Sequence, residues 1–349
     1  MRETGEIQED GTLDVGRGKG FSEAAIYRKI SACCYAIDGF RHRKCLDISR
    51  AERLHIGYNH QHYWLFLAGV YGMTQILLGP KTWNWPEDFL LIAGPCVIEN
   101  GTLCRHIAAR VEEICRRLGV TYVFKASFDK ANRSGAGSFR GQGMDRGLDV
   151  LAEIRHAQHL PVTTDVHETE QVAAVAEVVD VVQIPAFLCR QTDLLLAAGQ
   201  SGKVVNVKKG QFMAPWEMAN VVEKVRSTGN QQVMLTERGT FFGYNRLVND
   251  MTSIVQMQAL RVPVLFDATH STQLPGGLGT ASGGQRQYVE VLAAAATAAG
   301  ADGLFIEVHP EPEKSPSDAA TILPLDQLES LLVRCLAIRE ALRGTQQKH

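Results

Sequence analysis

The clearest chemical signal in this sequence is a set of basic side chains that each follow a short apolar segment. The four that could gather around a dianionic group are Lys125, Lys130, Lys208 and Arg238. Lysine offers a phosphate group a point charge, and arginine offers it a bidentate fork. The polar run from Lys130 to Ser134 adds a second anion-binding candidate. The pattern therefore predicts a site for two phosphorylated substrates.

A second set of side chains could hold a metal ion. It offers one thiol, one imidazole and two carboxylates, from Cys96, His270, Glu307 and Asp318. This mixture suits a borderline divalent ion such as Zn, Fe, Mn or Co better than Mg or Ca. The alternatives stay open for single residues, since a lone cysteine is more often a small core residue and His270 could equally be a packed histidine. Only the fold could bring the four together.

Eight short apolar, β-branched segments precede these groups, and helix-like stretches separate them. The segments are Phe89–Ala93, Thr121–Lys125, Pro161–Thr164, Val179–Ile184, Val204–Val207, Gln232–Leu235, Val262–Phe266 and Gly303–Ile306. Strands that alternate with helices indicate parallel pairing. Eight such units in about 260 residues match an α/β fold of the (β/α)8 TIM-barrel type, whose chemistry lies at the carboxyl ends of the strands. A doubly wound open sheet would need a glycine fingerprint, and Gly94-Pro95-Cys96 is not one.

The character of the chain changes near residue 85. We expect residues 1–85 to form an N-terminal extension of uncertain order and residues 86–349 to form the TIM-barrel catalytic domain. The most apolar stretch, residues 63–78, is shorter than the roughly 20 apolar residues of a spanning helix. It fits either a short element packed on the barrel or a membrane-surface segment, and we expect no membrane partner.

Composition narrows the function further. The net charge of -2 gives no basic excess that would favour nucleic acid. The eight cysteines form no C-x-x-C pair, which favours a reducing compartment and a cytoplasmic location.

Several motifs together resemble one enzyme family over about residues 89–343. They are IAGPCVIE from Ile92, FKASFDKANRS from Phe124, FRGQGMDRG from Phe139, TTDVHE from Thr163, QIPAFLCRQTDLL from Gln183, NVKKGQF from Asn206, LTERGTFFGYN from Leu235, FDATHSTQLPGG from Phe266 and EVHPEPEKSPSDAAT from Glu307. They resemble the 3-deoxy-D-manno-octulosonate-8-phosphate synthases. The resemblance implies the condensation of phosphoenolpyruvate with D-arabinose 5-phosphate and water. The products would be 3-deoxy-D-manno-octulosonate 8-phosphate and phosphate, for lipopolysaccharide biosynthesis.

The resemblance also implies roles for individual residues. Catalytic roles fall on Lys130, Asp318, His270 and Cys96. Phosphoenolpyruvate binding falls on Lys125, Lys130, Gln183, Ala186, Lys208 and Arg238. Sugar-phosphate binding falls on Asn132, Arg133, Ser134, Asp165, His167, Pro185 and Arg190, at a site that the family completes across a subunit interface in a homotetramer. Cys96 places the chain with the metal-dependent subclass, whose counterpart carries asparagine there, and His270, Glu307 and Asp318 match the other metal ligands.

Two alternatives share features with this interpretation. The first is 3-deoxy-D-arabino-heptulosonate-7-phosphate synthase, which shares the barrel, phosphoenolpyruvate and a cysteine-type metal site. The loop Lys130-Ala-Asn-Arg-Ser134 resembles the arabinose 5-phosphate site and not the Lys-Pro-Arg-Thr pattern of that enzyme. The second is a barrel that binds sugar phosphates without catalysis, which the competent residues at every candidate position disfavour.

Overall fold

A closed barrel of eight parallel strands forms the centre of the protein. The computed structural model describes residues 74–132, 135, 137–277 and 283–346. The barrel strands are β3 (Leu90–Gly94), β4 (Thr121–Lys125), β5 (Val162–Asp165), β6 (Val181–Ile184), β7 (Val204–Lys208), β8 (Val233–Glu237), β11 (Val264–Asp267) and β14 (Gly303–His309). Each pairs in parallel with its neighbours, and β14 closes the ring by pairing with both β3 and β11. The predicted TIM barrel is confirmed, and all eight expected segments contain a strand.

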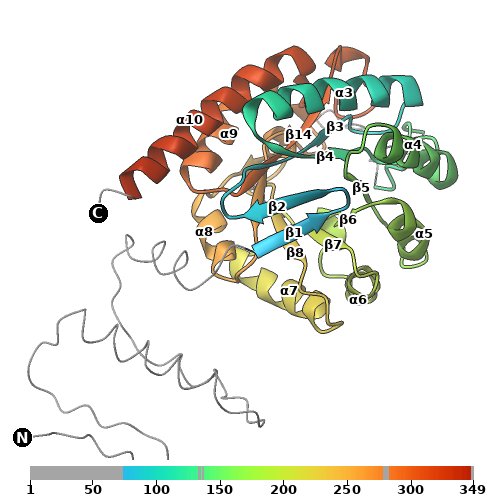
Figure 1. Ribbon diagram of the computed structural model, residues 1–349, viewed down its shortest axis with the longest axis horizontal. Helices are drawn as coiled ribbons and strands as arrows, with labels where there is room; N and C mark the ends of the chain where they lie inside the picture. The colour runs from blue at the N-terminus through green and yellow to red at the C-terminus, as the bar shows by residue number, and fades with distance from the viewer. Residues whose placement is uncertain (1–73, 133–134, 136, 278–282, 347–349) are drawn as a thin grey trace, which may run out of the picture. The chain divides into compact units, whose positions relative to one another are not determined.

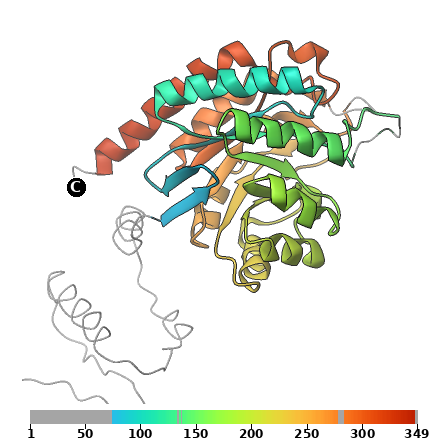
Figure 2. The same cartoon turned by 45° about the vertical axis from the view of Figure 1, so that its right-hand side comes forward.

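Helices cover the outside of the ring (Figure 1). They are α3 (Gly101–Leu118), α4 (Met144–Ala157), α5 (Gln171–Val178), α6 (Thr192–Gln200), α7 (Met218–Arg226), α8 (Thr252–Gln258), α9 (Val289–Ala298) and α10 (Leu328–Gln346). Helices α3 and α10 lie side by side in both views (Figure 2), and the ion pair between Arg117 and Glu329 joins them. Among the described residues, none of these helices has the length and apolar character needed to cross a membrane.

Five short strands of the described structure lie in the loops that follow the barrel strands. They are β9 (Thr240–Phe241), β10 (Leu247–Val248), β12 (Gln273–Leu274), β13 (Gly283–Gly284) and β15 (Leu323–Pro324). Strands β9 and β10 pair with each other, β12 pairs with β13, and β15 pairs in parallel with the end of β14. All five lie beyond the carboxyl ends of barrel strands, so they shape the loops on the side where a barrel carries its chemistry.

A hairpin of β1 (Thr74–Leu78) and β2 (Lys81–Trp85) precedes the barrel and lies across the middle of the ring in Figure 1. Its buried side chains Ile76, Leu78 and Trp83 pack with the residues that fill the barrel interior. The hairpin falls within the stretch 1–85 that we expected to be an extension, and this packing joins its described part to the barrel core. The division of the chain at residue 85 stays a prediction.

Side chains alternate along each barrel strand between an outer core under the helices and the inside of the ring. On β14, Leu304, Ile306 and Val308 belong to the outer core, whereas Phe305 belongs to the inner one. Two residues after Phe305, Glu307 therefore also points inward, because the side-chain period of a strand is two. The same alternation projects the last inward residue of several strands into one space at the carboxyl end of the barrel.

Candidate active site

The predicted site residues meet in a cavity of about 450 Å³ at the carboxyl ends of the strands. The predicted residues that line it are Lys125, Lys130, Asn132, Asp165, His167, Gln183, Pro185, Ala186, Lys208, Arg238, His270 and Asp318. Cys96 and Glu307 lie directly beneath, fully buried and in contact with lining residues. Residues from all eight barrel strands, or from the loops that follow them, therefore converge on one site.

Glu307 gathers two of the predicted phosphate-binding cations. Lys125 Nζ donates to Glu307 Oε1 at 2.8 Å, and Lys130 Nζ lies 3.8 Å from the same oxygen. Burial alone would raise the pKa of Glu307, but the charges of Lys125, His270 and Lys130 outweigh it and hold that pKa below its usual range. The carboxylate is therefore ionised, and it fixes the ammonium groups before any substrate arrives.

A glycine on β3, Gly94, allows β3 to approach Lys125 on β4 closely. A Cβ atom added at Gly94 would lie 2.0 Å from the carbonyl oxygen of Lys125, so no larger residue fits there. The close approach of β3 and β4 also lets Lys125 Nζ donate to the carbonyl oxygen of Cys96 at 3.1 Å. Gly94 thus sets the position of Cys96 relative to Lys125.

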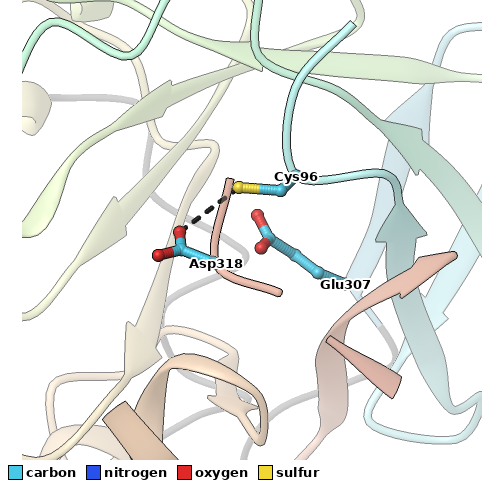
Figure 3. A group of neighbouring side chains, drawn as sticks. All are labelled: Cys96, Glu307 and Asp318. Atoms are coloured by element: carbon cyan, nitrogen blue, oxygen red, sulfur yellow. Dashed lines mark hydrogen bonds between the residues drawn. The ribbon is translucent and has the colours of Figure 1, made fainter. Parts of the chain in front are cut away.

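The four predicted metal ligands point toward one another. The ligand atoms of Cys96, Glu307 and Asp318 all lie within 4.8 Å of each other, and Figure 3 shows the three side chains converging from separate segments. Cys96 Sγ lies 3.3 Å from Asp318 Oδ2. The fourth ligand faces the same point, with His270 Nε2 at 3.6 Å from Glu307 Oε2 and 3.9 Å from Asp318 Oδ2.

These residues fit a divalent cation. Glu307 Oε2 is buried without a hydrogen-bond partner, although it faces His270 Nε2 across the group. Burial, with the nearby charge of Glu307, raises the pKa of the Cys96 thiol to about 12, so the thiol is protonated at neutral pH. A cation at this point would replace that proton and satisfy the unpaired oxygen. Asp318 reaches the group from a left-handed backbone conformation, with φ at 51°, which aspartate adopts more readily than most residues.

Asp267 connects the metal-ligand group to the lysine cluster. It is fully buried on β11, accepts from the backbone N–H of His270 at 2.9 Å and contacts His270 Nδ1 at 2.7 Å. The ammonium group of Lys208 donates to the same carboxylate. Burial opposes its ionisation, but the charges of His270 and Lys208 hold the pKa of Asp267 well below its usual range. An anionic Asp267 accepts a hydrogen bond from the Nδ1–H group of His270. The other ring nitrogen, Nε2, then faces Glu307 and Asp318 with its lone pair.

Asp165 organises the opposite side of the cavity. Ser127 Oγ donates to its Oδ1, and His167 Nε2 lies 2.9 Å from its Oδ2. Burial opposes ionisation of Asp165, yet the hydrogen bond and charge of His167 keep its pKa well below the usual range. The Nδ1 atom of His167 is buried and has no partner within the described protein. This side therefore offers an anion, a hydroxyl and an imidazole to a polar ligand.

Two further polar atoms in the cavity also lack partners among the described residues. Arg238 donates from Nη2 to Gln273 Oε1 at 2.7 Å, but its Nη1 has no acceptor. The Oε1 atom of Gln183 is likewise buried and unpaired. Buried polar groups are almost always hydrogen-bonded, so atoms of this kind indicate where a ligand is received.

Three predicted residues are not brought into the cavity by the described structure. Arg190 is exposed and lines a separate surface groove with Glu217 and Lys224. Arg133 and Ser134 lie outside the described residues. Their assignment to the sugar phosphate stays a prediction.

Some contributors were not assigned from the sequence. They are Asp267, Ser127, Gln273 and Ser317, whose Oγ lies 2.9 Å from Cys96 Sγ. The strand period places Asp267 on the inward face, two residues after Leu265, but it does not predict the contacts of Asp267 with His270 and Lys208. The other three lie in loops, where no period applies.

The sequence comparisons agree with this geometry. The sequence model of the DAHP synthetase I family matches residues 85–342. The chain belongs to this family. A protein of Syntrophotalea carbinolica named 2-dehydro-3-deoxyphosphooctonate aldolase is 58% identical over 263 residues, which cover 75% of this chain and 95% of that protein. Proteins of the same name from Cyanothece sp. and Desulfotalea psychrophila are 57% and 54% identical, over 73% of this chain in each case and 94% and 91% of their own lengths.

Proposed function

We propose that this chain is the enzyme that condenses phosphoenolpyruvate with D-arabinose 5-phosphate and water, giving 3-deoxy-D-manno-octulosonate 8-phosphate and phosphate. The observation that carries the proposal is the single cavity that holds both a buried cation cluster and a thiol–imidazole–carboxylate group. The relatives named 2-dehydro-3-deoxyphosphooctonate aldolase support the same reaction. The name denotes the eight-carbon acid formed by joining three carbons to five.

Phosphoenolpyruvate fits the cation cluster by charge. Its phosphate and carboxylate would lie among Lys125, Lys130, Lys208 and Arg238, with Gln183 and Ala186 at the wall of the cavity. The methylene carbon of the enol attacks the sugar aldehyde, water adds to the carbon that carries the phosphate, and the C–O bond to phosphate then breaks. Negative charge shifts onto the phosphate and the former aldehyde oxygen, where fixed cations stabilise it most in a buried site. Lys130, which also lies near Glu307, is the cation we place closest to the reacting carbons.

The metal ligands we assign are Cys96, His270, Glu307 and Asp318. When bound, a divalent ion such as Zn, Fe, Mn or Co would polarise the aldehyde oxygen or orient the attacking water. The residues around it hold the ligands in place, since Asp267 orients His270 and Ser317 contacts the Cys96 sulfur.

The pentose phosphate would occupy the other side of the cavity. Asp165 and His167 would bind its hydroxyl groups, and Asn132 and Pro185 line the entrance. We assign the phosphate of the sugar to Arg133, Ser134 and Arg190. The exposed position of Arg190 suits a subsite that a neighbouring subunit completes, as a homotetramer would provide.

The exposed aromatic side chains Phe212, Trp216 and Phe242 support self-association of this kind. In the described structure Cys96, Cys104, Cys115, Cys189 and Cys335 are buried and are not joined in disulfides, which supports a reducing compartment and hence the cytoplasm.

The reaction is tested by measuring phosphate release from phosphoenolpyruvate with D-arabinose 5-phosphate and, separately, with D-erythrose 4-phosphate. We expect turnover with the pentose phosphate that is lost on dialysis against a chelator and restored by added divalent metal. Faster turnover with erythrose 4-phosphate would instead indicate a 3-deoxy-D-arabino-heptulosonate-7-phosphate synthase. Turnover that survives chelation would keep the reaction and return Cys96 to a packing role. Sedimentation of the active enzyme would test the tetramer.

A further inference from the structure

An aromatic ring lies beneath two lysines of the cation cluster. Phe305 lies on β14, two residues before Glu307, and its side chain is fully buried. The Nζ atom of Lys208 lies over the ring at 3.5 Å from its centroid, and the Nζ atom of Lys125 lies at 5.6 Å. Phe305 is thus an inner-core residue in contact with the charged part of the site.

The ring faces Lys208 with its electron-rich surface. Ammonium groups within about 6 Å of an aromatic centroid are attracted by the ring quadrupole, and the attraction is strongest where water is excluded. Lys208 is buried, so its ammonium group has lost most of its hydration. Asp267 accepts a hydrogen bond from the ammonium group at its side. The ring stabilises the same charge from below without taking up a hydrogen-bond donor.

The hydrogen-bond donors of Lys208 that stay unused are important for ligand binding. An ammonium group has three donors and no acceptor. Asp267 receives one donor of Lys208. A carboxylate or amide in place of Phe305 would take another, whereas a ring attracts the charge and leaves the remaining donors available to a ligand in the cavity.

We propose that Phe305 is a positioning residue for phosphoenolpyruvate, acting as a cation–π platform that holds the ammonium group of Lys208 in place and aimed into the cavity. The inference rests on the proposed function, because Lys208 is taken to contact the phosphoenolpyruvate anion. A ring that served packing alone would need only shape and volume, and leucine or methionine fills such positions in barrel interiors. A platform needs the ring electrons as well.

The experiment changes the electron density of the Phe305 ring and keeps the shape of the side chain. Phe305 is replaced, by site-specific incorporation because the chain has 13 phenylalanines, with phenylalanine carrying one, two or three ring fluorines. Each fluorine withdraws density from the ring face. Binding of phosphoenolpyruvate is measured by calorimetry, KM for each substrate by phosphate release, and folding by thermal unfolding. We expect the dissociation constant and KM for phosphoenolpyruvate to rise in graded steps to about tenfold with three fluorines. KM for arabinose 5-phosphate and the unfolding temperature should stay constant.

Phe266 provides the matched control. It is equally buried on the neighbouring strand β11, but it belongs to the outer core beneath the helices. The same fluorines there should leave binding of phosphoenolpyruvate unchanged. Flat binding across the Phe305 series, in an enzyme that turns over normally, would overturn the platform and leave the reaction intact. Native protein that binds phosphoenolpyruvate but does not condense it would overturn the reaction alone, while a graded series would still support the platform. Native protein that binds no phosphoenolpyruvate would overturn both.

Discussion

Replacing Asp267 by asparagine tests whether one carboxylate supports both halves of the site. The substitution keeps the shape of the side chain and removes its charge. Asp267 contacts His270 Nδ1 at 2.7 Å and also accepts from Lys208. An asparagine has only one acceptor oxygen, so it cannot serve both partners as the carboxylate does. It could also present its amide N–H to Nδ1 and so stabilise the wrong tautomer of His270.

Two magnitudes follow from this geometry. Losing a partner that orients a metal-binding histidine lowers metal affinity by about 10- to 100-fold, which corresponds to about 1.4–2.8 kcal/mol. Removing one partner of a buried ion pair destabilises a protein by about 3–5 kcal/mol. Lys208 is buried and its pKa is already lowered, so release of its proton would limit the second loss. We therefore expect a cost nearer about 3 kcal/mol and a fall in Tm of roughly 5–10 °C.

The assay is competition for the metal against a chelator of known affinity, with denaturant unfolding in parallel. Asp302→Asn is the matched control. Asp302 is also buried, and it accepts from the backbone N–H of Val264 at 2.8 Å and from Gln258 at 3.0 Å. It stands just before β14, at the opposite end of the barrel from the cavity. This control should lose stability and keep native metal affinity.

Native metal affinity in Asp267→Asn would refute the reasoning, because His270 would then be oriented without the carboxylate. A loss of affinity in both variants would refute it in another way. It would mean that metal binding reports general loosening of the barrel and not the hydrogen bond to His270.

Three further perturbations test other parts of the structure. Cys96→Ala should abolish metal retention on dialysis, and in the native enzyme metal affinity should rise about tenfold per pH unit, because binding releases a thiol proton whose pKa is about 12. A pH-independent affinity would exclude the thiol as a ligand. Trp83→Ala should lower the free energy of unfolding by about 3–5 kcal/mol, since that side chain is fully buried against the inner core. Denaturant titration measures this, and an unchanged midpoint would contradict the packing. Arg238→Lys should raise KM for phosphoenolpyruvate about tenfold, since an ammonium group lacks the bidentate fork of a guanidinium. Initial-rate kinetics measures this KM, and an unchanged value would contradict the assignment of Arg238.

The sequence predicted the barrel well because its signals are local. Each strand is a short β-branched segment, and a period of two tells which residues share a face. Val123 and Lys125 on β4 illustrate this, since Val123 lies in the inner core and Lys125 opens into the cavity above it. The grouping of the predicted metal ligands follows from the eight strands, because the barrel brings their carboxyl ends together.

The adjacent lysines at the end of β7 show which properties the local sequence does not predict. Lys208 faces the cavity, whereas Lys209 is buried beyond the strand end, where it donates to the carbonyl oxygens of Gly210 and Met213. Both are strongly basic and both are buried, so the sequence alone does not separate a ligand-binding residue from one that orders a loop. Arg190 is a similar case, because a loop residue has no period that would predict which groove it lines.

The hairpin was missed for a related reason. Strands β1 and β2 are joined by a tight turn and have no helix between them. The alternation of strand and helix that marks the barrel therefore begins only after Trp85. The apolar side chains that close the inner core, such as Trp83, stand on the earlier side of that change.

The buried cations of the cavity are paired with buried carboxylates. Lys125 and Lys208 are paired with Glu307 and Asp267, so buried cations are tolerated before an anionic substrate arrives. Such pairs hold each ammonium group in a fixed place, and the substrate meets donors that need little reorganisation. A divalent ion that displaced the Cys96 proton would add one net positive charge next to Glu307. Because Oε2 of Glu307 would meet that ion while Oε1 accepts from Lys125, this one carboxylate would link the predicted metal ligands to the cation cluster.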